Sequence, residues 1–262
     1  MSNKFIKFLI IPALILLLTA GYLIYQGSQK QSQISSSKVL DQNQRPDYLI
    51  VLLGDSMTQA LGNSDELREY MAQYYPGRTF DFLNYGFGST NILSVEKRLT
   101  EWTFYGRDFQ PIMDIDFDLI LIESFGHNPL SDYPLEEGLS KQNEALDKII
   151  EIITSKQTRE KIIFVATISP NSKTYAYRQV DMDGETRKKW TTERVAYIKN
   201  HIKYAAEHNI PVINIFKESL DSTGDGNEEY ISETDYIHPS PKGIRFISKQ
   251  ISDFIFENRL LN

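Results

Sequence analysis

From residue 47 onward, apolar and polar positions alternate between two kinds of pattern along the chain. Short apolar runs indicate buried strands, and the run at 117–123 is apolar on both faces, as a central parallel strand is. Between these runs apolar residues recur every three or four positions, which indicates amphipathic helices. The alternation predicts a three-layer α/β/α fold around a five-stranded parallel sheet. We assign this sheet the flavodoxin-like strand order. The predicted strands span residues 48–53, 79–84, 117–123, 161–168 and 211–216.

Capping and breaking residues mark the ends of the predicted helices. Pro76 and Gly77 end a helix that runs from about 57 to 74. Ser240 and Pro241 begin the last helix, because serine caps a helix well and proline suits its first position. Further helices are predicted at about 91–100, through 146–153 and through 195–205.

Three segments fit this alternation less simply. The polar stretch 169–189 follows a strand end, so a lid or substrate-contact loop and a plain surface hairpin both remain open. The aromatic cluster at 102–105 is predicted to pack in the core, with a sugar-binding platform as the alternative. The acidic stretch 221–227 departs from the calcium-loop pattern and is predicted to be a solvated loop.

The first 46 residues differ in composition from the rest. Residues 8–25 are uncharged and nearly all apolar, which is long enough to cross a hydrocarbon core of roughly 30 Å. Because Lys4 and Lys7 precede this stretch, we predict a cytoplasmic segment at 1–7, a transmembrane anchor at 8–25, a flexible linker at 26–46 and a single domain at 47–262 outside the cytoplasm. The alternative is a signal peptide whose cleavage releases a secreted domain.

Composition excludes several classes of function. The chain has 262 residues, a formal charge of −7 and no run of Lys or Arg, which argues against nucleic acid as a partner. It has no cysteine, so disulfides, thiolate metal sites, a cysteine nucleophile and a lipid-bearing cysteine are all excluded. We predict neither a cofactor nor a metal, and the sequence gives no prediction of oligomeric state.

Candidate chemistry centres on Ser56, which follows the first strand and opens a helix. A serine nucleophile needs a base, and histidine is the usual one. The chain has four histidines, of which His201 and His208 lie on a polar helical stretch and are predicted to be solvated. His238 is distinguished by Asp235, because a carboxylate three residues earlier in a turn can hold the imidazole in the tautomer that accepts a proton.

Two further strand ends carry candidate oxyanion donors. Gly86 follows the second strand, where a glycine N–H can approach a ligand closely. Asn128 follows the third strand and offers a side-chain amide at the same edge of the sheet. Together with the Ser56 N–H they could form an oxyanion hole, although glycine and asparagine are also ordinary turn formers at such places.

These four blocks resemble, in order, those of the SGNH hydrolases, the GDSL-like esterase and lipase superfamily. The similar segments are Gly54-Asp55-Ser56-Met57-Thr58, Asn84-Tyr85-Gly86, Gly126-His127-Asn128 and Asp235-Tyr236-Ile237-His238-Pro239. The resemblance implies that Ser56 is the nucleophile, His238 the general base and Asp235 its orienting acid. It also implies that Ser56 N–H, Gly86 N–H and Asn128 hold the oxyanion, and that Asp55 supports the turn.

The sequence departs from the family pattern at two positions. Pro129 stands where many members have an aspartate, and Gly88 lies one position nearer Gly86 than usual. The resemblance still implies a bacterial serine esterase that acts through an acyl-enzyme on a small-molecule, lipid or glycan ester. The anchor predicted at 8–25 adds the expectation that it is membrane-anchored and that the ester is an O-acyl group of a cell-envelope glycan or lipid. An O-acyltransferase and a catalytically silent binding module are the alternatives.

Overall fold

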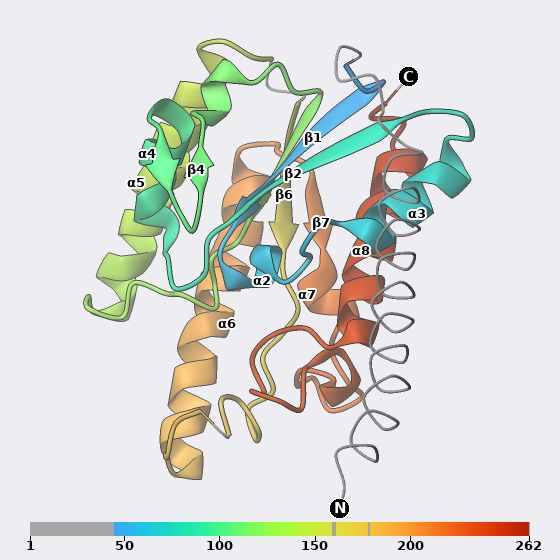
Figure 1. Ribbon diagram of the computed structural model, residues 1–262. Helices are drawn as coiled ribbons and strands as arrows, with labels where there is room; N and C mark the ends of the chain where they lie inside the picture. The colour runs from blue at the N-terminus through green and yellow to red at the C-terminus, as the bar shows by residue number, and fades with distance from the viewer. Residues whose placement is uncertain (1–44, 159–160, 178, 262) are drawn as a thin grey trace, which may run out of the picture. The chain divides into compact units, whose positions relative to one another are not determined.

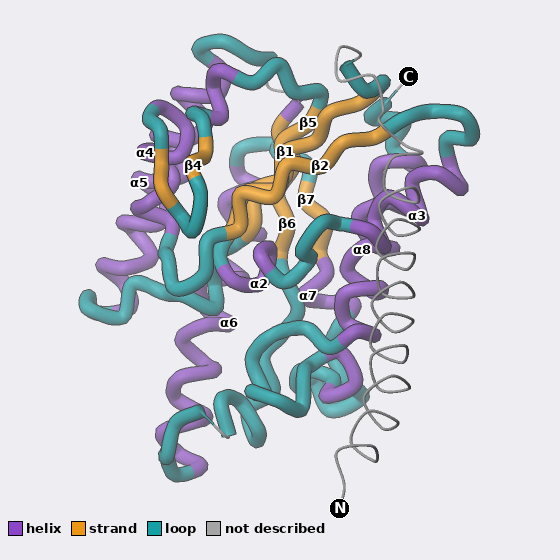
Figure 2. Tube along the Cα trace, in the orientation of Figure 1, coloured by secondary structure: helices purple, strands orange, loops and turns teal. Residues whose placement is uncertain are grey.

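The computed structural model describes residues 45–158, 161–177 and 179–261, and Pro46–Asn262 form one compact unit. Its centre is a parallel sheet with the strand order β2-β1-β5-β6-β7 (Figures 1 and 2). This confirms the predicted five-stranded sheet and its flavodoxin-like order. The strands are β1 (Tyr48–Gly54), β2 (Phe80–Gly86), β5 (Leu119–Glu123), β6 (Ile162–Ala166) and β7 (Val212–Asn214).

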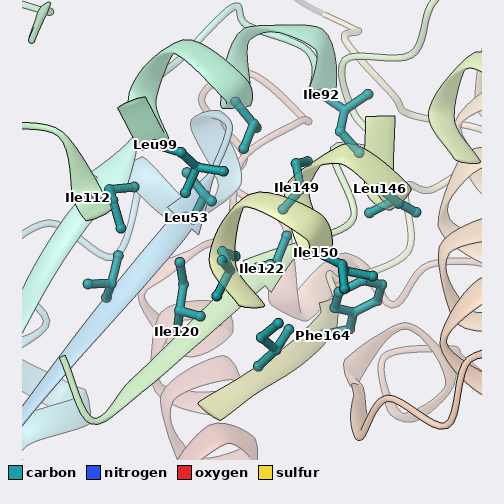
Figure 3. Packing of buried hydrophobic residues seen from close by; sticks show 14 of the residues in the cluster. Leu53, Ile92, Leu99, Ile112, Ile120, Ile122, Leu146, Ile149, Ile150 and Phe164 are labelled. Carbon is teal, nitrogen blue, oxygen red and sulfur yellow. The ribbon is translucent and has the colours of Figure 1, made fainter. Parts of the chain in front are cut away.

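Helices cover both faces of the sheet because alternate side chains of each strand point to opposite faces. In β1, Val51 and Leu53 pack into a core beneath α4 and α5, and Ile50 and Leu52 pack into a second core beneath α3 and α8. Figure 3 shows part of the first core. The longer helices are α3 (Asp65–Tyr74), α4 (Val95–Thr100), α5 (Leu135–Thr154), α6 (Gly184–Glu207) and α8 (Pro241–Glu257).

Helix ends follow the predicted capping in one place and depart from it in another. Ser240 Oγ accepts a hydrogen bond from Gly243 N–H, so the predicted start of the last helix is confirmed. The helix predicted from 57 to 74 is instead two helices, because Gly62 and Ser64 adopt positive φ angles of 54° and 60° between them. The short elements are α2 (Ser56–Gln59), α7 (Ile215–Glu218), η2 (Ile92–Ser94), η3 (Ile112–Asp114) and η5 (Glu228–Tyr230).

A small antiparallel hairpin, β3 (Thr103–Phe104) with β4 (Asp108–Phe109), follows α4. The prediction that its aromatic residues pack in the core is wrong for two of them, because the exposed fractions of Trp102 and Phe104 are 66% and 74%. The third, Tyr105, stacks on Phe87 with ring centroids 4.5 Å apart. The 169–189 stretch contains no β-hairpin in its described part; it is a loop that leads into the start of α6.

The prediction that His201 is solvated is wrong. Its side chain is fully buried, stacks on Phe164 at 4.1 Å between ring centroids, and lies 3.3 Å from the Ile122 carbonyl through Nε2. Burial lowers the pKa of His201 to about 3, so the ring is neutral in the folded protein. His208 is half-buried and stacks on Tyr204 at 3.8 Å.

Within the described residues, no helix is long and apolar enough to cross a membrane. The predicted anchor at 8–25 and nearly all of the predicted linker at 26–46 lie outside those residues. The anchor, the linker and the alternative of a cleaved signal peptide therefore stay predictions.

Candidate active site

The carboxyl edge of the sheet gathers the predicted site residues, and β1 delivers the serine. Ser56 is the first residue of α2 and is half-buried. The turn before it is tight: a Cβ on Gly54 would lie 2.0 Å from Thr58 Oγ1 and 2.8 Å from Glu123 Cβ, so only glycine fits there. Between them, Asp55 caps the helix by accepting a hydrogen bond from Met57 N–H at 2.8 Å.

Asp55 is buried and fully engaged, so it supports the turn. Besides capping α2, its Oδ2 accepts a hydrogen bond of 2.8 Å from Asn128 Nδ2. An amide nitrogen carries two hydrogens, and this contact uses one of them. Asp55 therefore orients the Asn128 side chain beside Ser56 and leaves its second N–H for another acceptor.

A buried carboxyl that sequence reasoning missed lies under this turn. Glu123 Oε2 accepts from Asp55 N–H at 3.3 Å, and Oε1 accepts from Phe125 N–H at 3.0 Å and from Ser124 Oγ at 2.8 Å. Burial and the Asp55 carboxylate raise the pKa of Glu123 well above its usual range. The sequence does carry a signal, because an acidic residue ends an otherwise apolar strand.

Arg98, also missed from the sequence, joins the nucleophile turn to the end of β2. Its Nη1 donates to the carbonyls of Gly54 at 2.7 Å and Tyr85 at 3.0 Å, and its Nη2 donates to Thr90 Oγ1 at 2.6 Å. Burial lowers the pKa of Arg98 to about 10, which leaves the guanidinium charged at neutral pH. The charge is compensated by hydrogen bonds, as a buried cation requires.

The two glycines after β2 lie in different surroundings. Gly86 N–H donates to Asn84 Oδ1 at 2.8 Å, and a Cβ there would lie 2.2 Å from Gln59 N. Gly88 lies over the serine, since a Cβ on Gly88 would be 3.6 Å from Ser56 Cβ. Its N–H donates to Gln59 Oε1 at 3.1 Å, an exposed side chain that can move away.

The structure brings Asp235 and His238 together. His238 Nδ1 and Asp235 Oδ2 are 2.7 Å apart, and Asp235 Oδ1 accepts from the backbone N–H of Ile237 at 2.9 Å and of His238 at 3.0 Å. Burial acts to raise the pKa of Asp235, but these hydrogen bonds outweigh it and the pKa is lowered. An ionised Asp235 holds the proton on Nδ1 and leaves Nε2 as an acceptor.

His127, in the turn that carries Asn128, is a buried histidine rather than a second base. The ring is buried, its Nε2 lies 3.1 Å from the Ile168 carbonyl, and burial lowers its pKa to about 4. The Asp55 carboxylate acts to raise this pKa and His238 acts to lower it, and burial has a larger effect than either. No hydrogen bond joins Ser56 Oγ to His238 Nε2 within the described residues, and in unliganded enzymes this bond is often long.

The part of the chain that the structure describes contains no group of three or more His, Asp or Glu side chains placed to hold a metal ion.

A family model described as the GDSL-like Lipase/Acylhydrolase family matches residues 52–246. A search of curated proteins finds no match. Among solved structures, the lipase/acylhydrolase from Enterococcus faecalis is 21% identical with a TM-score of 0.59, and the match covers 80% of this chain and 96% of that one. A GDSL-like lipase from Bacteroides thetaiotaomicron is 13% identical with a TM-score of 0.55, covering 81% of this chain and 89% of that one.

An acetyl xylan esterase is also similar, at 13% identity and a TM-score of 0.57, covering 79% of this chain and 99% of that one. At these identities the likeness to solved structures is one of fold. The family model, in contrast, spans most of the chain and includes the Ser56 turn, the Asn128 turn and the His238 loop. The chain therefore belongs to the GDSL-like lipase/acylhydrolase family, a family of ester hydrolases.

Proposed function

We propose that this protein is a serine esterase that works through an acyl-enzyme, with Ser56 as nucleophile, His238 as general base and Asp235 as the acid that orients it. The observation that carries the proposal is the 2.7 Å contact between His238 Nδ1 and Asp235 Oδ2. That contact fixes the tautomer a general base needs, on the same edge of the sheet as the serine.

In the first step Ser56 Oγ bonds to the ester carbonyl carbon while His238 Nε2 takes the hydroxyl proton. The tetrahedral intermediate collapses, the bond to the alcohol oxygen breaks, and the alcohol leaves with the proton from His238. Water then attacks the acyl carbon and gives a proton to His238. The bond from that carbon to Ser56 Oγ breaks, His238 returns the proton to Oγ, and the carboxylic acid leaves. Ionised Asp235 stabilises the imidazolium that forms in each half-reaction.

The oxyanion needs donors, and we assign them to Ser56 N–H, the free hydrogen of Asn128 Nδ2 and the Gly88 N–H. The prediction that Gly86 supplies the third donor is less favoured, because its N–H already donates to the Asn84 side chain. Gly88 becomes available once the exposed Gln59 side chain turns away. Asn128, which Asp55 already holds, costs no such rearrangement, and donors held in place before the reaction cost no reorganisation in the transition state.

We further propose that the enzyme acts outside the cytoplasm on O-acyl groups of an envelope glycan or lipid. The support is the apolar stretch 8–25 behind Lys4 and Lys7, which predicts an anchor or a secretion signal. One structure of similar fold is named for deacetylating a glycan, acetyl xylan esterase. Removal of acyl groups and their transfer to another hydroxyl share the first step and differ in the acceptor.

The test is turnover of a 4-nitrophenyl ester series from acetate to decanoate by the full-length protein. We expect release of 4-nitrophenol that is lost in Ser56→Ala and unchanged in Ser140→Ala, which alters an exposed serine on α5. Equal turnover by wild type and Ser56→Ala would refute the serine mechanism. Product analysis with an added sugar acceptor separates hydrolysis from acyl transfer.

A further inference from the structure

A groove of about 920 Å³ lies between the loop after β5 and the first turns of α6. α6 extends beyond the carboxyl edge of the sheet (Figure 1), and residues 185–193 form one wall. Ser131, Tyr133, Pro134 and the first residue of α5, Leu135, form the other, and Ser131 Oγ donates to Glu193 Oε2 at 3.0 Å where the walls meet. The volume is in the range of ligand sites in proteins.

The groove begins close to the reacting centre. Ser131 is three residues beyond Asn128, and three residues of extended chain span at most about 11 Å. Asn128 is itself bonded to Asp55, the neighbour of Ser56. A group held in the groove therefore lies within a few sugar lengths of an ester bound at the serine.

Two aromatic rings in the groove, Tyr133 and Trp190, are each fixed by a cation. Lys141 Nζ lies 4.7 Å from the centroid of the Tyr133 ring, and the Arg194 guanidinium lies 5.1 Å from that of Trp190. Arg194 is anchored in turn, since Nη1 donates to the Trp190 carbonyl at 3.1 Å and Nε to Tyr175 Oη at 2.7 Å. Neither cation lines the groove, so each ring presents another part of its surface to it.

The polar lining has no net charge. Two carboxylates, two ammonium groups and several hydroxyl groups line the groove, together with two aromatic rings and the side chains of Pro134 and Leu135. A polyanion would need an excess of cations, which this groove does not have. Flat rings among many hydrogen-bonding groups instead suit a neutral, polyhydroxylated ligand. The charged residues are Glu185, Glu193, Lys188 and Lys189.

We propose that this groove binds the glycan chain of a polysaccharide ester, as the alcohol part of the substrate. The proposal rests on the function proposed above, because the acyl group is the one that Ser56 attacks. Rings already fixed by Lys141 and Arg194 lose little conformational freedom when a sugar stacks on them. The groove thus selects the alcohol, while the site at Ser56 performs the chemistry.

The first test compares two substrates on the full-length enzyme. The glycan probes are partially O-acetylated hexaoses of xylose, glucose and N-acetylglucosamine, and the small probe is 4-nitrophenyl acetate. In Tyr133→Ala and in Thr192→Arg, which fills the groove from α6, we expect the ratio of kcat/KM for the glycan over the aryl ester to fall about tenfold. The control Phe256→Ala removes an exposed aromatic side chain on α8 and should leave the ratio unchanged.

The second test measures binding without turnover. The chain has two tryptophans, so Trp102→Phe combined with Ser56→Ala leaves Trp190 as the only indole in an inactive protein. Titration with the three unacylated hexaoses should give a saturable change in its emission for at least one of them, with about tenfold weaker affinity after Tyr133→Ala. Absence of a saturable change with all three, or affinities unaltered by Tyr133→Ala and Thr192→Arg, would overturn the proposal.

The two tests separate this proposal from the function on which it rests. Saturable binding at Trp190 together with aryl-ester turnover that survives in Ser56→Ala would support glycan binding in the groove and refute the serine mechanism. Ser56-dependent turnover with an unaltered substrate ratio in both groove variants would support the serine mechanism and overturn the proposal for the groove.

Discussion

Replacing Asp235 by Asn changes one atom and should reverse the tautomer of His238. The Asn carbonyl oxygen can still accept the N–H groups of Ile237 and His238, now at 2.9 and 3.0 Å from Asp235 Oδ1, so the loop keeps its shape. The amide nitrogen then occupies the position of Oδ2, 2.7 Å from Nδ1, and donates to it. With Nδ1 as acceptor the proton moves to Nε2, which can no longer take the serine proton.

The expected loss follows from that exchange of donor and acceptor. A triad with its histidine in the wrong tautomer loses on the order of 10⁴ in kcat, or roughly 5.5 kcal/mol of transition-state stabilisation. KM should change little, because substrate binding does not use Asp235. The free energy of unfolding should fall by only about 1 kcal/mol, since the backbone hydrogen bonds of the loop survive.

The assay is steady-state hydrolysis of 4-nitrophenyl acetate at neutral pH, with urea denaturation to follow stability. Asp253→Asn is the matched control, because Asp253 also accepts hydrogen bonds from neighbouring side chains, those of Tyr74 and Lys249, but lies on α8. That variant should keep its kcat. A loss of less than tenfold in a folded Asp235→Asn protein would refute the assignment of Asp235 as the orienting acid.

Three further predictions follow from the geometry. Asn128→Ala should lower kcat on the same ester by a factor of roughly 10² to 10³. A change below tenfold would show that the Asn128 amide does not bind the oxyanion. Gly86→Ala places a Cβ 2.2 Å from the Gln59 backbone nitrogen and should lower the melting temperature. Gly88→Ala places a Cβ 2.6 Å from Gln59 Oε1, which can move, so this variant should fold but lose activity. A lower melting temperature for Gly88→Ala than for Gly86→Ala would contradict this account. The pKa of buried His201 is about 3 in the folded protein and about 6.5 in the unfolded chain, so between these pH values only the unfolded chain binds the proton. His201 should therefore lower the free energy of unfolding by roughly 1.4 kcal/mol for each pH unit from 6.5 down to 3. His201→Phe should flatten that dependence in urea titrations at pH 7, 5 and 4, and an unchanged slope would show that His201 is already protonated in the fold.

Local patterns predicted the sheet well because a run of neighbouring apolar residues is enough to identify a buried strand. The runs at 48–53 and 117–123 became β1 and β5, and the alternation of strands and helices indicated a parallel sheet. The β3–β4 pair was missed because strands of two residues carry no periodicity. The helix predicted from 57 to 74 failed for another reason: its break depends on left-handed backbone at Gly62 and Ser64.

The candidate site was predicted where its residues are close in sequence or stand at strand ends. Asp235 and His238 are three positions apart, and the structure places them in contact. Glu123 and Arg98 were missed because their roles come from contacts with Asp55 and Gly54, 68 and 44 positions away. The acidic end of an apolar strand marks Glu123 as unusual, but no spacing in the sequence identifies the partners of either residue.

His201 shows the same limit for burial. Charged neighbours such as Lys203 suggested a solvated stretch, yet the mean polarity of a helix does not say which of its faces meets the sheet. In the fold, His201 meets β5 and β6 through the Ile122 carbonyl and the Phe164 ring. A buried histidine with a backbone partner behaves as a core residue.

The most direct measurement of the central claim is covalent labelling of the full-length protein with a fluorophosphonate, followed by peptide mass spectrometry. This reagent reacts with a serine that an adjacent base activates. We predict one adduct, on the peptide that contains Ser56, absent in Ser56→Ala and strongly slowed in His238→Ala. No adduct on Ser56, or labelling at the wild-type rate in His238→Ala, would contradict the account.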